Sequence, residues 1–403
     1  MFLELLLAAS LGIFAGIFTG LTPGVHINLV AILVVSSASY LLGIFSLASL
    51  GVFIIAMAIT HTFLDTIPAI FLGAPEADTA LGVLPGHKLL LQGRGYEAVK
   101  LTIVGSFFSF LLALAFFPLF IWIVPRVYEG LQKWIAWILI VIMAYMILGE
   151  RSNEARLYAA VVFLLSGILG AFVFNFPNLN QPLFPLLSGL FGISMLIVSL
   201  SDNAQIPKQY ITDEIRLGKW QSFKALLSAT FSGSLVSFFP GLGPAQAAII
   251  GSNTMGKTNN YTFLVLVGGI NTVNMLVSLV SLYTIDKARN GAVLAMQQII
   301  DKVDFNMLIL FIGTSLFAAG IATFLTLYIS RVFSNVISHV NYKVLTLSII
   351  TFIVALTFYF SSFMGLLILI TSTAIGIIPN VVNVKRSHAM GCLILPVILF
   401  FLL

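Results

Sequence analysis

The sequence predicts an all-α polytopic membrane protein, and two observations carry this prediction. Hydrophobic residues make up 60% of the 403 residues and charged residues only 8%, whereas about a quarter of the residues in a soluble domain are charged. Apolar runs of about 20 residues, long enough for a helix to cross a bilayer, recur along the whole chain. These runs are continuous, so they exclude a membrane β-barrel, whose strands alternate over about 10 residues.

We expect about 10–12 transmembrane helices. In the first half they fall near residues 3–21 and 25–43, which form a broken pair, and near 48–72, 99–124, 132–149, 156–174 and 183–201. In the second half they fall near 222–239 and 245–253, a second broken pair, and near 262–284, 306–331, 343–360, 362–379 and 388–403. The longest hydrophilic connection, residues 201–224, divides the chain near its middle, and no stretch is left for a sizeable soluble domain.

The two halves share a pattern around a Pro-Gly dipeptide, "FTGLTPGVHINLV" in the first and "VSFFPGLGPAQAA" in the second. When Pro23-Gly24 is set against Pro240-Gly241, Gly16 falls opposite Gly233. We therefore divide the chain into two related transmembrane repeats, residues 1–205 and 206–403, an organisation typical of secondary transporters. An odd number of spans per repeat makes the repeats inverted. We expect an inverted pair, although the even spread of Lys and Arg among the loops does not decide the number.

Pro-Gly in an apolar segment predicts a broken helix or a re-entrant hairpin. Proline removes a backbone donor and glycine adds backbone freedom, and broken backbone survives in a bilayer only where protein or a water-filled cavity surrounds it. The start of the second half-helix then presents N–H groups and a partial positive charge, which suit a carboxylate or a phosphate. The alternative is a plain proline kink with glycine allowing close packing. Two matched breaks favour a binding site.

The expected substrate-binding residues surround the two breaks: Thr22, Pro23, Gly24, Val25, His26, Asn28, Pro240, Gly241, Leu242, Gly243, Pro244 and Gln246. Ser237 and Asn253 add polar groups near the second break. His26 has an alternative role as a hydrogen-bonded histidine at the membrane interface. Side chains of these types orient a ligand through hydrogen bonds.

His61 and Asp65 form a second group of interest, because residues four apart share one helix face and ionisable groups inside a membrane are functional candidates. In the other half, Asn271 and Asn274 open the corresponding span with neutral polar groups. We expect these residues to couple transport to H+ or Na+, with a structural His–Asp clamp as the alternative. Neither a cofactor nor a bound metal is expected.

Other charged residues have a simpler interpretation. Glu150, Arg151, Glu154 and Arg156 indicate a solvated loop with helix-end pairs, and Lys385 and Arg386 indicate a topology anchor. The single cysteine, Cys392, excludes an intramolecular disulfide and a cysteine-based zinc site. The net charge of +5 is spread over short loops without a polybasic run, so nucleic acid is not an expected partner.

In its motifs the chain resembles the large membrane subunit of tripartite tricarboxylate transporters, the TctA-like family, and in its length the compact archaeal-type branch. "GLTPGVHINLV" and "SFFPGLGPAQAAIIG" look like the family's glycine-proline signatures, and "TIPAIFLGAPEADTA" and residues 79–109 are similar to further family segments. The resemblance implies uptake of di- or tricarboxylates with a small membrane subunit and an extracytoplasmic binding protein. Carried over by position, it places these residues at the substrate: Pro23, Gly24, Pro240, Gly241, Gly243 and Pro244.

We therefore expect a secondary transporter for a small organic anion, multi-pass in the plasma membrane, which works by alternating access around the two breaks. Membrane lipid and a homodimeric copy are further expected partners. The alternative function is translocation of a polyprenyl-phosphate lipid carrier, whose head group is also an anion. An enzyme is not expected, because the chain lacks H-E-x-x-H, G-x-S-x-G and the phosphate-binding G-x-x-x-x-G-K-[ST].

Overall fold

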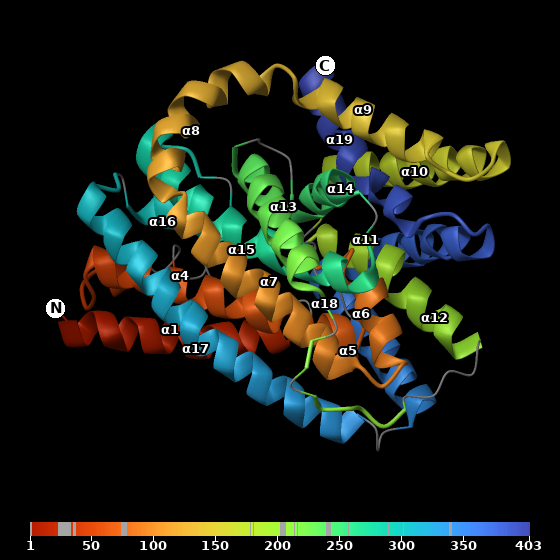
Figure 1. Cartoon of the computed structure of the whole chain (residues 1–403), viewed down its shortest axis with the longest axis horizontal. Coiled ribbons are helices and arrows are strands. Elements are labelled where there is room, and N and C mark those ends of the chain that lie inside the picture. The colour runs from red at the N-terminus through yellow and green to blue at the C-terminus, as the bar shows by residue number, and fades with distance from the viewer. Residues whose placement is uncertain are drawn as a thin grey trace.

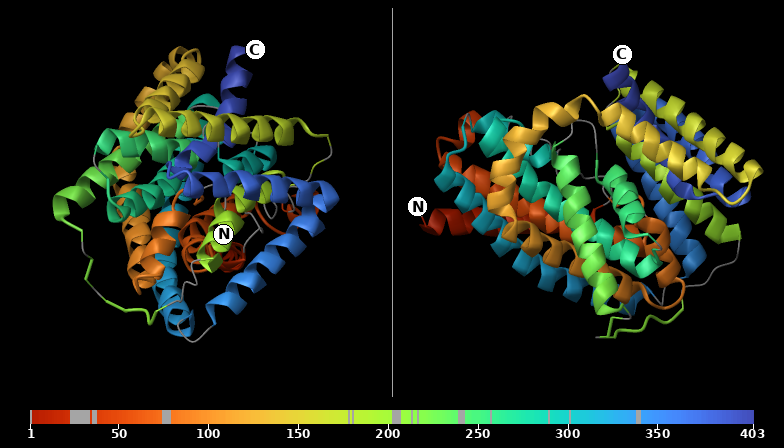
Figure 2. Two further views of the ribbon diagram at one scale, coloured as in Figure 1. Left: turned by 90° about the vertical axis from the view of Figure 1, so that its right-hand side faces the viewer. Right: turned by 45° about the horizontal axis from the view of Figure 1, so that its top comes forward.

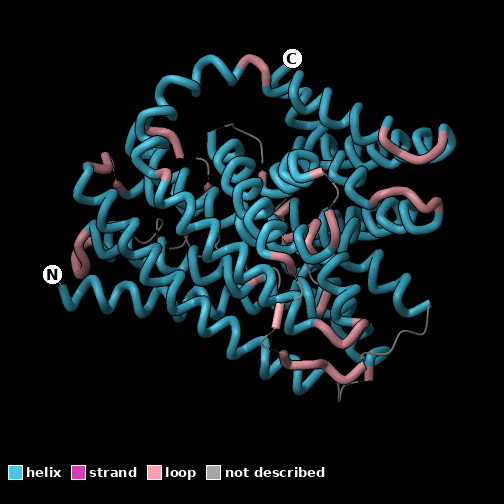
Figure 3. The backbone as a smooth tube through the Cα atoms, in the orientation of Figure 1, coloured by secondary structure: helices cyan, strands magenta, loops and turns pink. Residues whose placement is uncertain are grey.

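A computed structural model describes residues 2–22, 34, 38–73, 79–177, 179, 181–201, 207–212, 214–215, 217–238, 243–256, 258–288, 290–300, 302–337 and 341–403. Within these residues the chain is helical, without strands (Figures 1 and 3). The first half contains α1 (Phe2–Leu21), α3 (Ala38–Leu41), α4 (Leu47–Leu64), α5 (Thr66–Phe71), α6 (Val83–Leu90), α7 (Gly95–Ala115), α8 (Phe117–Gln132), α9 (Ile135–Leu148), α10 (Asn153–Asn175), α11 (Leu183–Leu187), the π-helical η1 (Ser188–Ile193) and α12 (Ser194–Ser201).

The second half contains α13 (Lys219–Phe238), α14 (Pro244–Met255), α15 (Asn260–Ile285), α16 (Gly291–Ile299), α17 (Phe305–Ile337), α18 (Tyr342–Val381), the 3-10 helix η2 (Arg386–Met390) and α19 (Gly391–Leu402). By length and composition, seven helices of the described chain can cross a membrane, and four shorter apolar helices accompany them. The protein is thus a multi-pass, all-helical membrane protein, as predicted.

Several predicted spans are divided where the sequence breaks the helix. The span at 48–72 becomes α4 and α5, which meet at Asp65, because Pro68 has no N–H to donate to the preceding turn. The span at 99–124 ends at Phe116, two residues before Pro118. The spans predicted near 343–360 and 362–379 both fall within α18, which is kinked between them at Ser362, where φ is 53°.

Helix α1 packs along α4 in the same direction. At their starts, Glu4 Oε1 accepts hydrogen bonds from Ser46 N and Ser49 Oγ, each at 2.8 Å. Further along, a Cβ added to Gly16 would lie 2.6 Å from both Met57 O and Thr60 Cβ, so the two helices touch closely.

Helices α13, α14 and α15 form a comparable unit. Helix α14 runs back alongside α13, since Ser228 Oγ of α13 donates to Gly251 O of α14 at 2.7 Å and lies 2.7 Å from Thr254 Oγ1. Helix α15 then runs in the same direction as α13. A Cβ added to Gly233 would lie 2.9 Å from Ile270 O, and so this crossing is also close, although less so than that of α1 and α4.

Each of these units packs against a long helix from the other half. In the first unit, α4 and α5 lie parallel to α17, with Gly51 against Phe311 and the rings of Phe71 and Phe333 5.9 Å apart. In the second unit, α15 lies parallel to α7, with Arg94 bonded to Tyr261 at their starts and, further along, Thr272 Oγ1 donating to Ser106 O at 2.8 Å.

The two sets of helices run in opposite directions. The Arg331 guanidinium, near the end of α17, lies 5.8 Å from the ring centre of Tyr96 at the start of α7. The end of α15 likewise meets the start of α17, where the Tyr283 and Phe305 rings are 6.1 Å apart. Thus α1, α4 and α17 run one way and α7, α13 and α15 the other (Figures 1 and 2).

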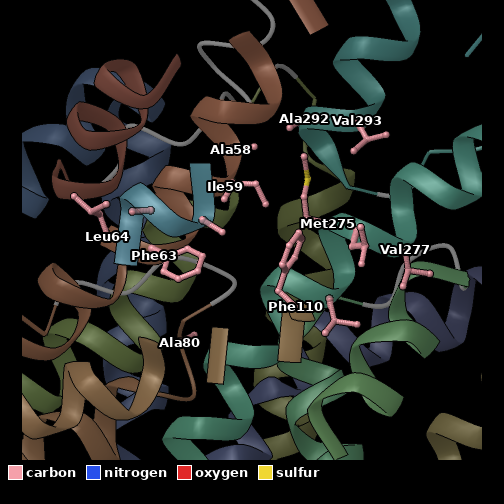
Figure 4. Packing of buried hydrophobic residues seen from close by; sticks show 14 of the residues in the cluster. Ala58, Ile59, Phe63, Leu64, Ala80, Phe110, Met275, Val277, Ala292 and Val293 are labelled. Atoms are coloured by element: carbon pink, nitrogen blue, oxygen red, sulfur yellow. The ribbon is translucent and has the colours of Figure 1, made fainter. Parts of the chain in front are cut away.

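The remaining helices form further crossings between the halves. Helix α10 packs on α19, where Gly170 lies directly against Cys392 O, and η1 packs on α18, where Gly376 lies against Leu190 O. The buried core continues through the middle of the molecule, where Ala58 and Ile59 of α4 face Met275 of α15 (Figure 4). Helices α4 and α15 therefore join the two units in the core.

Candidate substrate-binding site

Most residues of the two predicted breaks lie outside the described part of the chain. These are Pro23, Gly24, Val25, His26 and Asn28 at the first break, and Pro240, Gly241 and Leu242 at the second. Thr22 is described at the end of α1, where its backbone N–H donates to Phe18 O at 3.1 Å. Gly243, Pro244 and Gln246 are described at the start of α14.

The start of α14 has the cap expected of a half-helix. Gly243 is extended, Pro244 occupies the first helical position, and the Gly243 N–H donates to Gln246 Oε1 at 2.8 Å. Gln246 is buried, at 2% exposure, so its amide is committed to holding this turn. Proline at the first helical position gives up no helical hydrogen bond. A new helix can therefore begin at Pro244, a few residues after α13 ends at Phe238.

His61 and Asp65 lie inside the protein, each at 3% exposure. His61 Nδ1 is 3.0 Å from Thr19 Oγ1, which joins α4 to the last turn of α1. The Asp65 backbone N–H donates to His61 O at 2.9 Å, and Asp65 lies where α4 passes into α5. The predicted pair is therefore buried next to the end of α1.

Asn274 makes the corresponding link in the second half. Ser237 Oγ of α13 lies 3.0 Å from Asn274 Oδ1 and 3.1 Å from Asn274 O, and Ser278 Oγ is 3.4 Å from the same Oδ1. Asn271, one turn earlier, is 5% exposed, and its Oδ1 has no hydrogen-bond partner among the described residues. Helices α1 and α13 are thus each bonded to the next span, α4 or α15, through one side-chain hydroxyl, that of Thr19 or Ser237.

The packing register changes the correspondence between the halves. Gly16 lies against Met57 and Thr60, whereas Gly233 lies against Ile270 and Val273. His61 therefore corresponds to Asn274, and Asp65 to Ser278. Of the two asparagines, Asn274 rather than Asn271 therefore lies at the position of His61.

The ends of α1 and α13 reach the middle of the spans beside them. The last turn of α1 bonds to His61, just past the middle of the apolar span Leu47–Phe71. The last turn of α13 bonds to Asn274, just past the middle of α15. Since the two sets of helices run in opposite directions, α1 and α13 approach the middle of these neighbouring spans from opposite directions.

A cavity of about 490 Å³ lies at the other end of α14 from the break. Its wall carries the basic residues Lys88, Lys385 and Arg386, and no carboxylate is present among its described lining residues. Ser252, Asn253 and Asn259 add hydrogen-bonding groups. Asn253, expected beside the second break, instead lines this cavity in the last turn of α14.

The cavity follows one face of α14 toward the break. Ile249, Asn253 and Gly256 line it, and Gln246 lies on the same helix face one turn before Ile249. Lys88 and Lys385 are exposed, so the cavity opens at the surface on the side where α13 and α15 begin. Nearby, burial lowers the pKa of His87 to about 4, although its bond to Ile70 O opposes this shift, so His87 adds no charge near neutral pH.

Arg386 is buried in the cavity wall, at 8% exposure, whereas Lys385, the other residue predicted as a topology anchor, is exposed. Its Nη2 group donates to Ser194 Oγ at 2.5 Å and to the carbonyls of Leu190 and Gly376, both at 3.4 Å. Its Nε is buried without a hydrogen-bond partner among the described residues. The guanidinium is therefore held through its Nη2 group, and its Nε–H has no hydrogen-bond acceptor among the described residues.

Glu150 is also buried rather than solvated, which corrects the prediction for this loop. Its Oε1 lies 2.9 Å from His388 Nε2, with exposures of 6% and 0% for the two side chains. Arg151 and Glu154 are exposed, as predicted. The Glu150–His388 pair ties the connection between α9 and α10 to η2, two residues from Arg386.

The sequence did not reveal the cavity, because its polar groups come from separate segments of both halves. One signal was present in the sequence: an arginine between two apolar segments is a functional candidate as readily as an anchor. Among the described residues, no three His, Cys, Asp or Glu side chains gather as a metal site. The described polar lining of the cavity is therefore made of cations, amides and hydroxyls, groups that suit an anion.

Comparison with known proteins agrees with this chemistry. The family model described as tripartite tricarboxylate transporter TctA family matches residues 6–391. The uncharacterized protein MJ1079 of Methanocaldococcus jannaschii is 31% identical over 406 residues, which cover 98% of this chain and 99% of that protein. No solved structure matches the chain.

Proposed function

Because the chain belongs to the tripartite tricarboxylate transporter TctA family, we propose that it carries a di- or tricarboxylate across the membrane as a secondary transporter. The family's activity is transport, not catalysis. The proposed mechanism is alternating access around the two Pro-Gly breaks, with Thr22, Gly243, Pro244 and Gln246 among the residues nearest the substrate.

The observation that carries this proposal is the opposed arrangement of α1 and α13. Each runs parallel to the next span and ends near that span's middle, bonded to it at His61 or Asn274. A helix that starts again at mid-depth, as α14 does after Gly243, presents free N–H groups and a partial positive charge. Two such ends approached from opposite faces suit a substrate that must be released on either side.

We further propose that residues 1–205 and 206–403 are inverted repeats. The supporting observation is that contacts between the halves occur in matched pairs. Helices α4 and α17 pack as α15 and α7 do, and α18 packs on η1 as α10 packs on α19. A two-fold axis in the membrane plane would relate each member of such a pair to the other.

Ion coupling is proposed for the residues beside the two ends. His61 and Asp65 are the proposed groups for H+, because both are ionisable and buried. Asn271 and Asn274 are better suited to Na+ or to the substrate, since amide oxygens are neutral ligands for hard cations. Either ion would replace ATP as the driving force.

The partners and the location follow from the family. As a member of a tripartite family, the protein works with other components, and we propose that these are a small membrane subunit and an extracytoplasmic binding protein. The proposed membrane is the plasma membrane. A homodimer stays a prediction from sequence.

Uptake by vesicles tests the proposed function. Purified protein in proteoliposomes should accumulate labelled citrate or succinate under a proton or sodium gradient, and Gly241→Leu should abolish this uptake. The matched control is Gly313→Leu in α17, where nothing lies within 4 Å of an added Cβ, and this variant should transport normally. If the vesicles move a polyprenyl phosphate and neither carboxylate, the lipid-carrier alternative is correct and the proposal is wrong.

A further inference from the structure

The cavity beside α14 is unusual in its charge. Three cations, Lys88, Lys385 and Arg386, stand in its wall with no carboxylate among the described lining residues. The carboxylate of the neighbouring Glu150 is already paired with His388, with 2.9 Å between Oε1 and Nε2. Like charges gathered around one space repel each other, and a bound anion relieves that repulsion.

Arg386 supplies an independent observation that points to a ligand. Within the described chain it makes no ion pair, although it is more than nine-tenths buried, and only its Nη2 group is hydrogen-bonded. A buried charge without a counter-ion is costly unless a partner arrives. Guanidinium groups bind carboxylates through two donors at once, and Arg386 is one of the residues that line the cavity.

We propose that this cavity is a binding site for a carboxylate ion with at least two negative charges, in which Arg386 receives one carboxylate and Lys88 or Lys385 the other. Ser252, Asn253 and Asn259 donate or accept the remaining hydrogen bonds. The site rests on the proposed transport function as the place where substrate first binds from the face on which α13 and α15 begin. The α14 face from Asn253 through Ile249 to Gln246 leads from it toward the second break.

The Glu150–His388 pair has a positioning role in this site. It fixes η2 against the connection between α9 and α10, and Arg386 belongs to η2. Ser194, Leu190 and Gly376 hold the guanidinium from the opposite side. The cation is thus set in place before the anion arrives, which reduces the entropy lost on binding.

The test uses a new cysteine in the cavity wall. Cys392 is fully buried, so in Ser252→Cys the added thiol is the one that a water-soluble maleimide reaches. Citrate or succinate, without any ion gradient, should slow this labelling at least fivefold, and acetate should not. Labelling of Gln221→Cys, an exposed position of α13 outside the cavity wall, should be unaffected by any of these anions.

Charge removal then identifies the receptor groups. Adding Arg386→Gln or Lys88→Gln to Ser252→Cys should raise the citrate concentration needed for protection at least tenfold, whereas Lys343→Gln, a change of an exposed lysine on α18, should not. Lys88 is exposed, so its variant tests the site even if Arg386→Gln does not fold. Inorganic phosphate and a polyprenyl phosphate form two further arms, and protection by the lipid but by neither carboxylate would overturn the proposal.

The outcomes separate this site from the transport function. Charge-dependent protection by citrate in protein that shows no uptake would leave the site standing and overturn the transport proposal. Absence of protection at saturating citrate, or equal protection after Lys88→Gln and Arg386→Gln, would overturn the site. Normal citrate uptake by Lys88→Gln and Arg386→Gln, with an unchanged KM, would also overturn the site but would leave the transport proposal standing.

Discussion

The unit formed by α1 and α4 and the unit formed by α13 and α15 are packed alike but differ in chemistry. In both, a glycine brings the helices together, and a hydroxyl near the end of the first helix bonds to the middle of the second. At corresponding positions, however, the first unit has His61 and Asp65 where the second has Asn274 and Ser278. At these positions the first unit carries ionisable side chains and the second carries neutral ones.

This difference separates what both units need from what only one performs. Close packing and the hydroxyl bond occur in both, so they belong to the scaffold that ends a helix at mid-depth. At the compared positions ionisable side chains occur in the α1–α4 unit and not in the α13–α15 unit, so we assign the proposed ion coupling to the α1–α4 unit. The open cavity lies beside α14, in the other unit. We infer that the α1–α4 unit couples transport to an ion and that the unit containing α14 makes the first contact with the substrate.

The largest expected effect is on packing. Gly16→Leu and Gly233→Leu should each lower the free energy of unfolding by about 3 kcal/mol, because overpacking a close crossing forces the helices apart. Gly16→Leu should cost more, since an added Cβ lies nearer to its neighbours there. The measurement is thermal unfolding in detergent. Gly320→Leu, where nothing lies within 4 Å of an added Cβ, is the control, and an equal loss in it would remove the argument.

A smaller effect on stability, but a large one on coupling, is expected for Asp65→Asn. This change gives the first unit a neutral side chain at the position of Ser278 in the second, and should alter the pH dependence or the Na+ dependence of citrate uptake, because ionisable groups inside a membrane are candidates for ion coupling. Ser278→Ala should leave the pH profile unaltered. Should Asp65→Asn keep the wild-type profile, the His61–Asp65 pair is a structural clamp.

The smallest expected effect compares the two hydroxyl bonds. Ser237→Ala leaves Asn274 Oδ1 with Ser278 alone, at 3.4 Å, and should cost about 1–2 kcal/mol. Thr19→Val should cost less, because His61 has a further partner besides Thr19. Chemical unfolding measures the loss in free energy of unfolding for both variants. Thr323→Val on α17 is the control for the exchange of threonine for valine. The reverse order would mean that the first unit depends more on its hydroxyl.

The sequence predicted those features that depend on local chemistry. Pro244 and Gln246 indicated where α14 begins, and the paired glycines Gly16 and Gly233 indicated equivalent crossings. The register between the halves was missed, because identity between them is too low to choose among positions three residues apart. The cavity was missed for another reason: Lys88, Asn253 and Arg386 lie far apart in sequence, and only tertiary packing brings them together.

The central claim, that α1 and α13 start on opposite faces of the membrane, is tested most directly by side-specific labelling. Ile44→Cys, exposed in the turn before α4, marks the face where α1 and α4 start, and Lys219→Cys marks the start of α13. With Cys392 buried, a membrane-impermeant maleimide applied to intact cells should label one of these variants, and inverted vesicles should label the other. Labelling of both variants from the same side would contradict the opposed arrangement on which the account depends.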